Sequence, residues 1–347
     1  MRRRISPKHL GARQMAEPLV SIMMLAYNHA GNIARAIESV LHQKVSFPIE
    51  LVIGEDASTD GTKAIVLEYE RRRPDIIRVI TSPTNVGMKA NNYRAIKACR
   101  GKYLAFCEGD DYWHHPGKLQ KQADYLEGHP ECGLVFSSYD VYHVSSKTLT
   151  RDFLRHRALK IPTDPGLLDI LDFWSGTMIL TCTVMTRRTL SVQVIESDPY
   201  IHQSELFLLG DVQHWAEIAT VARLHYIPES LATYNMTAES ATRSKDIKKI
   251  LRFAISNAEV FIYLCKKYRV PEDIRMKHEE SRRGSSLRLS FHSRDADLAD
   301  EVRRQATTFT LKEWLRYYGA KNLVVHYLYR FTASVYAMFR KDHERWS

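Results

Sequence analysis

The amino-acid sequence predicts an α/β fold, in which a mostly parallel sheet is flanked by helices and followed by a helical C-terminal region. In the first third of the chain, short apolar runs of β type alternate with segments of helical period, which is typical of a parallel sheet covered on both faces. Polar turns follow these runs. From residue 244 onward, apolar residues recur at helical spacing, and this pattern predicts helices.

Four strands and three helices are expected before residue 108. The strand runs span residues 20–26, 49–54, 76–80 and 101–107. The segment 33–43 is predicted to be helical because its apolar residues recur every three or four positions. A helix is also predicted from about 63 to 70, after a turn with several N-cap residues, and another over 89–99. Short connections between these elements favour a single layered α/β domain.

A polar turn follows each expected strand, at residues 27–32, 55–62, 85–88 and 108–111. Ligands of such sheets bind at the carboxyl ends of the strands, so we expect one crevice to collect all four turns. This half of the chain contains neither a GxGxxG after the first strand nor a GxxxxGK[ST] motif. A dinucleotide-binding Rossmann site and a P-loop NTPase are therefore disfavoured.

The last of these turns brings three carboxylates together, those of Glu108, Asp110 and Asp111. Burying them unpaired would cost roughly several kcal/mol each. A divalent cation would relieve this cost, because hard cations take oxygen ligands and often bridge to a phosphate. The alternative is a solvated acidic turn.

Bulk properties narrow the class of protein. The net charge of +10 indicates an anionic neighbour, such as nucleic acid, a membrane surface or a phosphorylated ligand. Five cysteines without CxxC spacing indicate reduced thiols in a cytosolic protein. Residues 1–17 form a basic, flexible lead-in without the apolar run of a secretory signal, and no stretch reaches the roughly 18 apolar residues of a membrane span.

The ordered set of motifs resembles family 2 glycosyltransferases. It runs from the first strand with Tyr27-Asn28, through Glu55-Asp56 and the 85–87 turn, to Glu108-Gly109-Asp110-Asp111. Fainter similarity continues through a strand-like segment at 181–188, through Leu209-Gly210-Asp211 with Trp215, and through a closing strand at 224–234. The resemblance implies an inverting enzyme with the Rossmann-like GT-A fold over residues 18–240, followed by a helical region over 241–347.

The resemblance also assigns roles to individual residues. Contacts to a nucleotide sugar are implied for Ala26, Tyr27, Asn28, Glu55, Asp56, Lys89 and Asp110. Asp110 and Asp111 occupy the DXD-type position, with Glu108 in place of the more common first aspartate, and together these three would hold Mg²⁺ or Mn²⁺. Asp211 would be the general base that deprotonates the acceptor. A Gly-Asp pair before a helix is also a natural N-cap, and this alternative stays open.

The implied reaction moves a sugar from a nucleotide-diphosphate donor, with UDP favoured, to a hydroxyl of a glycan or lipid-linked acceptor in cell-surface polysaccharide or glycolipid synthesis. A polyprenyl phosphate acceptor would be anionic already and would need no base. A nucleotidyltransferase is a rival, but it would require a Gly-rich basic loop after the first strand. A basic nucleic-acid-binding protein is a second rival; we expect no nucleic acid partner, because the predicted crevice is acidic.

The C-terminal region has two features of its own. Residues 281–286 predict a hinge-like break between helices. Between residues 314 and 341, aromatic and aliphatic side chains are interleaved with arginine and lysine, which suits an anionic membrane surface. The alternatives are a helix docked on the catalytic domain and a dimer contact. These patterns predict a cytoplasmic protein that is peripheral at the inner face of the cell membrane.

Overall fold

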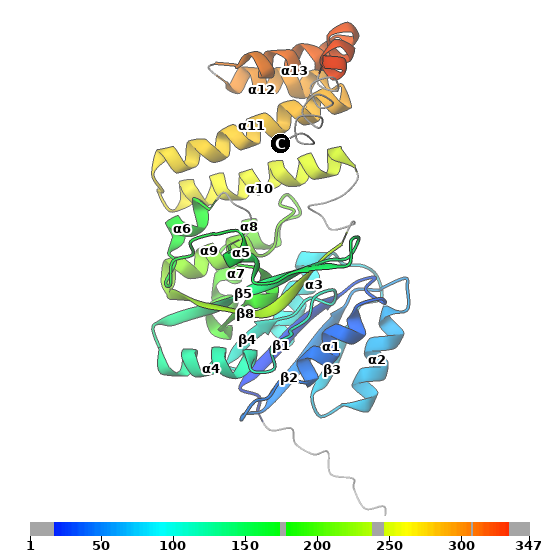
Figure 1. Cartoon of the computed structure of the whole chain (residues 1–347), viewed down its shortest axis with the longest axis vertical. Coiled ribbons are helices and arrows are strands. Elements are labelled where there is room, and N and C mark those ends of the chain that lie inside the picture. The colour runs from blue at the N-terminus through cyan, green and yellow to red at the C-terminus, as the bar shows by residue number, and fades with distance from the viewer. Residues whose placement is uncertain (1–16, 174–177, 238–245, 307, 333–347) are drawn as a thin grey trace, which may run out of the picture.

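The computed structural model describes residues 17–173, 178–237, 246–306 and 308–332. Its centre is an eight-stranded sheet with the order β3-β2-β1-β4-β7-β5-β6, in which β8 pairs with β5 (Figure 1). The pairs β1–β2, β1–β4, β2–β3 and β5–β8 are parallel, whereas β7 runs antiparallel to both β4 and β5. The sheet is therefore mixed, with its parallel first half as predicted.

The predicted elements of the first half are confirmed, with ends that move by a few residues. The strands are β1 (Val20–Ala26), β2 (Ile49–Glu55), β3 (Ile77–Thr81) and β4 (Tyr103–Phe106). The helices between them are α1 (Ile33–Leu41), α2 (Thr62–Arg72) and α3 (Met88–Ala98). The basic lead-in lies outside the described residues, apart from residue 17.

The second half of the sheet is built from elements that were predicted only in part. The strands are β5 (Cys132–His143), β6 (Thr148–Thr150), β7 (Met185–Arg187) and β8 (Arg223–Met236). The helices are α4 (Lys118–Gly128), α5 (Phe153–His156), α6 (Leu167–Leu171), α7 (Arg188–Ser197), α8 (Pro199–Gln203) and α9 (Val212–Val221). The closing strand at 224–234 is confirmed by β8. The strand-like segment at 181–188 needs a correction, because it begins with a 3-10 turn at Thr181–Thr183 and contains only the short strand β7.

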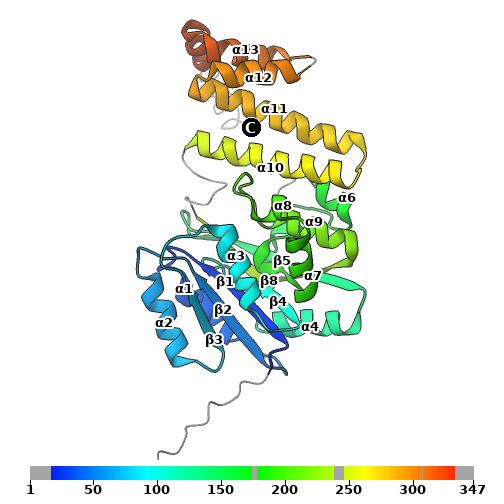
Figure 2. The ribbon, with the colours of Figure 1, turned by 180° about the vertical axis from the view of Figure 1, so that it is seen from behind.

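Two apolar cores cover the two faces of the sheet (Figures 1 and 2). On one face, α1 and α4 pack on the strands through buried residues such as Ile37 and Leu119. On the other face, α3, α7 and α9 supply residues such as Ile96 and Trp215. This second core continues into the C-terminal helices through Phe261, so the two parts of the chain share apolar packing.

The C-terminal helices are stacked on one another beyond the carboxyl ends of the parallel strands (Figure 1). They are α10 (Ile247–Lys267), α11 (Glu272–Ser293), α12 (Ala296–Gln305) and α13 (Leu311–Lys321), and residues 323–332 are also helical. The predicted break at 281–286 is wrong, because α11 runs through it. Gly284 has open space around it, and its cost of about 1 kcal/mol in a helix is small beside the packing of α11 against its neighbours.

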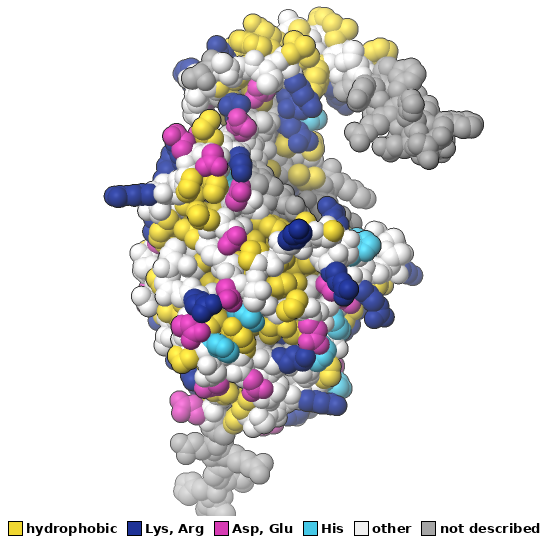
Figure 3. Space-filling view, turned by 60° about the vertical axis from the view of Figure 1, so that its left-hand side comes forward, with side chains coloured by type: hydrophobic (Ala, Val, Ile, Leu, Met, Phe, Trp, Pro, Cys, Tyr) yellow, Lys and Arg dark blue, Asp and Glu magenta, His cyan; other side chains and the backbone are white. Residues whose placement is uncertain are grey.

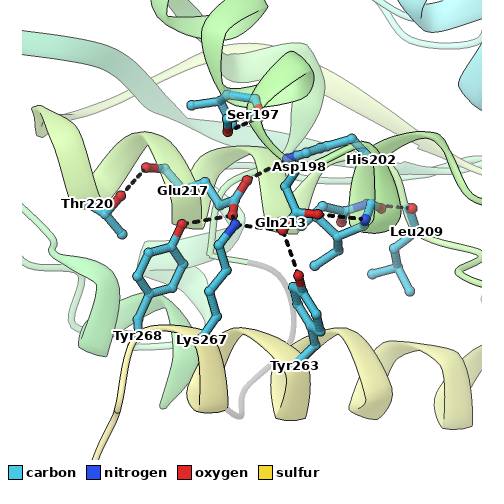
Figure 4. A network of polar contacts seen from close by, with 12 residues as sticks. Ser197, Asp198, His202, Leu209, Gln213, Glu217, Thr220, Tyr263, Lys267 and Tyr268 are labelled. Atoms are coloured by element: carbon cyan, nitrogen blue, oxygen red, sulfur yellow. Dashed lines mark hydrogen bonds and ion pairs between the residues drawn. The ribbon is translucent and has the colours of Figure 1, made fainter.

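A buried polar network fastens α10 to the rest of the chain (Figure 4). The Lys267 ammonium donates to Asp198 Oδ2 over 2.6 Å and also to Glu217 in α9. The hydroxyl of Tyr268 donates to Glu217 over 2.8 Å, and that of Tyr263 to Asp198 over 2.7 Å. Burial alone would raise the pKa values of Glu217 and Asp198, but these contacts, together with a 2.6 Å hydrogen bond between His202 and Glu217, hold both pKa values below their usual range. The first C-terminal helix is therefore tied by charge to the helix that follows Asp211.

Candidate active site

A cavity of about 980 Å³ lies at the carboxyl ends of β1, β2 and β4 and extends to α10 and α11. Each of the four polar turns lines it, through Tyr27, Asp56, Asn85 and the acidic turn at 108–111. The prediction that one crevice collects these turns is therefore confirmed. Its volume reaches the upper end of the usual range for ligand pockets, which gives room for more than one small ligand.

The acidic turn is held in place by the end of β8. The backbone N–H of Asn235 donates to Asp111 Oδ1 over 2.9 Å, and its side-chain amide donates to the carbonyl of Asp110. Tyr112 and Thr233 exchange backbone hydrogen bonds next to it. Asp111 is consequently buried, with 2% of its surface exposed, while the side chains of Glu108 and Asp110 remain partly open to the cavity.

The three carboxylates repel one another in a poorly hydrated place. Burial raises the pKa of Glu108 well above its usual range, and the charges of Asp111, Asp110 and Asp211 add to that effect. Burial and the Asp110 charge likewise raise the pKa of Asp111. In the described part of the chain, no three histidine, cysteine or acidic side chains converge as a complete metal cage. The donor set instead fits Mg²⁺ or Mn²⁺ held by one or two carboxylates together with phosphate oxygens of a ligand.

Asp56 both lines the cavity and orders the turn after β3. Its two carboxylate oxygens accept the backbone N–H groups of Val86 and Gly87 over 2.9 and 3.1 Å. The guanidinium of Arg94 lies 3.9 Å from Asp56 Oδ1 and donates to the carbonyls of Glu55 and Thr81. The carboxylate of Asp56, which is predicted to contact a nucleotide base, is therefore held in a fixed orientation.

The other predicted donor-side residues fall into two groups. Ala26 and Tyr27 line the cavity, and 43% of the Tyr27 surface is exposed. Asn28 and Glu55 are not among the lining residues. Asn28 Oδ1 accepts the N–H of Thr59 over 2.8 Å, and Glu55 Oε1 accepts that of Ser58 over 2.6 Å. In this structure these two side chains hold the 56–62 turn beside the cavity instead of facing into it.

Lys89 also lines the cavity, but its ammonium is engaged. It donates to the carbonyl of Ser204 over 2.7 Å and to that of Ile201 over 3.4 Å. Burial lowers its pKa, and the nearby Glu205 carboxylate partly opposes that shift. Lys89 thus connects α3 to the segment after α8, which brings residues 208–211 over the sheet edge.

Asp211 lies at the start of α9 and lines the same cavity as the acidic turn, close enough for its charge to raise the pKa of Glu108. Its Oδ1 accepts the N–H of Val212 over 2.8 Å, and its Oδ2 accepts the hydroxyl of Thr181 over 3.0 Å. Burial raises the pKa of Asp211, while these two hydrogen bonds partly counter the shift. Asp211 therefore caps the helix and presents a carboxylate to the cavity at the same time, so the two alternatives are compatible.

Sequence reasoning did not find several residues that shape the site. Asn235 and Arg94 have no motif around them, and their roles depend on partners far away along the chain. Asn91 donates from its side chain to the carbonyl of Gly54 over 2.9 Å and fixes the end of β2. A polar residue on the sheet-facing side of a helix would signal such a role, but the sequence alone does not tell which side of α3 faces the sheet.

Residues 21–190 match the family model described as "Glycosyl transferase family 2". The chain belongs to glycosyltransferase family 2. This family 2 chain is 45% identical over 117 residues to the uncharacterized protein Rv1520 of Mycobacterium tuberculosis, a match that spans 34% of each protein. It is 29% identical over 231 residues to TuaG of Bacillus subtilis, a protein assigned to teichuronic acid biosynthesis as a glycosyltransferase, with 66% of this chain and 83% of TuaG covered.

Solved structures of similar fold include two complexes with nucleotide sugars. TarS 1–349 of S. aureus, in complex with UDP-GlcNAc, superposes with a TM-score of 0.53 at 17% identity and covers 87% of this chain and 79% of TarS. The mannosyltransferase PcManGT of Pyrobaculum calidifontis, in complex with GDP-Man and Mn²⁺, gives a TM-score of 0.54 at 15% identity, with 90% and 87% covered. At these identities the similarity concerns the fold, and it confirms the GT-A prediction for this family 2 chain.

Proposed function

We propose that the protein is an inverting glycosyltransferase, which transfers a sugar from a nucleotide-diphosphate donor to a lipid-linked or glycan acceptor. One observation carries the proposal: a single cavity brings together Asp56, the acidic turn and Asp211, which lie far apart in the sequence. The complexes of TarS with UDP-GlcNAc and of PcManGT with GDP-Man support a nucleotide-sugar donor for this fold.

The two acidic centres suit the two halves of an inverting displacement. The leaving nucleoside diphosphate gains negative charge, which Mg²⁺ or Mn²⁺ on Asp110 would stabilise as a Lewis acid, with Glu108 and Asp111 beside it. The acceptor hydroxyl must lose its proton on the opposite face of the sugar, where Asp211 would accept it. The raised pKa of Asp211 makes this carboxylate a stronger base than an exposed aspartate.

The donor site is tested by calorimetric titration with UDP, GDP and dTDP, each in Mn²⁺ and in EDTA. We expect one diphosphate to bind with Mn²⁺, and to lose about tenfold or more in affinity in EDTA and in Asp110→Asn. Asp124→Asn, an exposed aspartate on α4, is the matched control and should bind like the unchanged protein. If a folded protein binds none of the three, or if Asp124→Asn loses as much as Asp110→Asn, the proposal fails.

We also propose that the far end of the C-terminal helices contacts an anionic membrane surface. No helix in the described part of the chain is long and apolar enough to cross a bilayer. Apolar and basic side chains nevertheless gather over α13 and the helical residues after it (Figure 3). Leu311, Val324 and Phe331 are 76%, 67% and 68% exposed. We call the surface formed by Leu311, Lys312, Leu315, Arg316, Val324, Tyr327, Leu328 and Phe331 the terminal face.

Hydrophobic insertion combined with attraction of basic residues explains why this face would select an anionic bilayer; each basic residue near the surface contributes about 1 kcal/mol. Co-sedimentation with phosphatidylglycerol vesicles should exceed that with phosphatidylcholine and fall with salt. The double variant Val324→Asp/Phe331→Asp should lose binding, whereas Leu206→Asp, at a site that is also 67% exposed, should not. Equal binding to both lipids, or equal loss in both variants, would contradict this role. Membrane attachment would place the enzyme at the inner face of the cell membrane.

A further inference from the structure

The cavity changes character beyond Asp211. Its donor end is lined by polar side chains, among them Asp56, Asn85, Asn92 and Glu108. The lining supplied by residues 170–173 and 178–179 and by α10 and α11 is mostly apolar, but it also includes Asn257, His278 and Ser281. We call this part of the cavity the apolar arm, and define it by Phe153, Ile170, Phe173, Met178, Ile179, Phe253 and Phe261.

The walls of the apolar arm come from four separate parts of the chain. Phe153 begins α5, Ile170 lies in α6 with Phe173 just after it, Met178 and Ile179 precede the turn at Thr181, and Phe253 and Phe261 lie on α10. Ile170, Met178 and Ile179 are at most 5% exposed, so they form a fixed floor. Phe173 and Phe253 are only partly buried, which leaves ring surface open toward the cavity.

This surface does not suit the hydroxyl groups of a free sugar chain. A buried hydroxyl needs a hydrogen-bond partner. Among the described residues of this wall only Asn257, His278 and Ser281 carry polar side chains, so most hydroxyls of a glycan chain would lose their bonds to water without replacement. Hydrocarbon, in contrast, gains from every methylene group that it removes from water. A ligand that occupies both ends of the cavity therefore has to be polar near Asp211 and apolar beyond it.

We propose that the apolar arm holds the hydrocarbon chain of a lipid acceptor, with the group that receives the sugar at Asp211. This inference rests on the proposed function and specifies the acceptor class. The terminal face is consistent with it, because an enzyme whose acceptor is a lipid must take that acceptor from a bilayer. Phe253 and Phe261 of the arm lie on α10, the helix after which α11 to α13 continue toward the terminal face (Figure 1).

The experiment compares decyl β-glucoside, below its micelle concentration, with methyl β-glucoside, by calorimetry in the presence of UDP and Mn²⁺. We expect the decyl compound to bind about a hundredfold more tightly, because only its chain reaches the apolar arm. Phe253→Gln and Phe173→Gln, from two separate parts of the lining, should each weaken decyl glucoside binding about tenfold. Leu67→Gln, at an exposed apolar residue of α2, is the matched control and should change nothing.

Three outcomes would overturn the inference: equal affinity for the two glucosides, no loss in either folded arm variant, or an equal loss in Leu67→Gln. Two variants keep the test decisive if one of them fails to fold, as judged by its thermal melting curve. Titration of the same samples with UDP, GDP and dTDP separates this inference from the proposed function. If one of these diphosphates binds and the decyl chain does not, only the apolar arm fails; if none of the three binds, the proposed function fails. Decyl phosphate, run in parallel, tells whether the polar end of the acceptor is a hydroxyl or a phosphate.

Discussion

Replacing Asp211 by asparagine is expected to lower kcat by roughly 10²–10⁴-fold, the usual contribution of a general base. Asparagine is as good an N-cap as aspartate, so α9 should keep its start and the protein its stability. The side-chain oxygen would still accept the Thr181 hydroxyl, but the amide could not accept a proton. Steady-state kinetics with the donor at saturation measures the loss, and unchanged diphosphate affinity would assign it to the acceptor side.

Thr181→Val provides a control that leaves the carboxylate in place. The hydroxyl of Thr181 lowers the pKa of Asp211, so its removal should raise that pKa further. The acid limb of the pH–rate profile should then move to higher pH, because the base becomes protonated sooner. Full activity of Asp211→Asn at every pH would contradict the base assignment, and would favour an acceptor that is already anionic, such as a polyprenyl phosphate.

Replacing Lys267 by methionine is expected to destabilise the protein by about 1–3 kcal/mol, because two buried carboxylates lose a charged hydrogen-bond partner that is itself 29% exposed. The substitution keeps most of the side-chain volume and leaves Glu217 with His202 and Tyr268, and Asp198 with Tyr263. Chemical denaturation at neutral pH measures the loss. Lys266→Met is the matched control. Lys266 is exposed and lies next to Lys267 on the same turn of α10, so its replacement should change the stability little.

The pH dependence of the stability loss in Lys267→Met follows from the direction in which the pKa values of Asp198 and Glu217 are shifted. Contact with Lys267 lowers the folded-state pKa values of Asp198 and Glu217, so their stabilisation is complete above the ordinary carboxyl pKa. It is lost as the pH falls through the lowered folded values. In Lys267→Met the folded pKa values rise instead, so the difference between the two proteins should shrink as the pH drops below about 4. A difference that stays constant down to pH 2 would show that packing, and not charge, is responsible.

The part of the sheet formed by β1 to β4 could be predicted because the sequence patterns that indicate it are local. β1 is a continuous apolar run, and the turn residues that follow each strand lie next to it in the sequence. A parallel sheet then brings the ends of these strands together, whatever the rest of the chain does. For this reason the crevice, and the position of Asp56 and the acidic turn within it, followed from the sequence.

The rest of the fold and of the site depends on contacts between residues far apart in the sequence, which no local pattern predicts. Asn235 meets Asp111 across 124 positions, and Lys267 meets Asp198 across 69. β5 was not predicted, although its run of Leu134, Val135 and Phe136 is of strand type. The continuity of α11 through Gly284 is a case of tertiary packing that overrides a weak local preference for a break.

Helix α9 has a consequence for dividing this chain into modules. Its first residue is preceded by Asp211, and its middle carries Glu217, which is bound to Lys267 and Tyr268 of α10. A chain cut at the end of β8 would expose Glu217 and the apolar core that α10 covers, and would loosen the helix that positions the carboxylate. We infer that the smallest stable transferase unit extends through α10, and that chimaeras with relatives should be joined after residue 268 and not near residue 240.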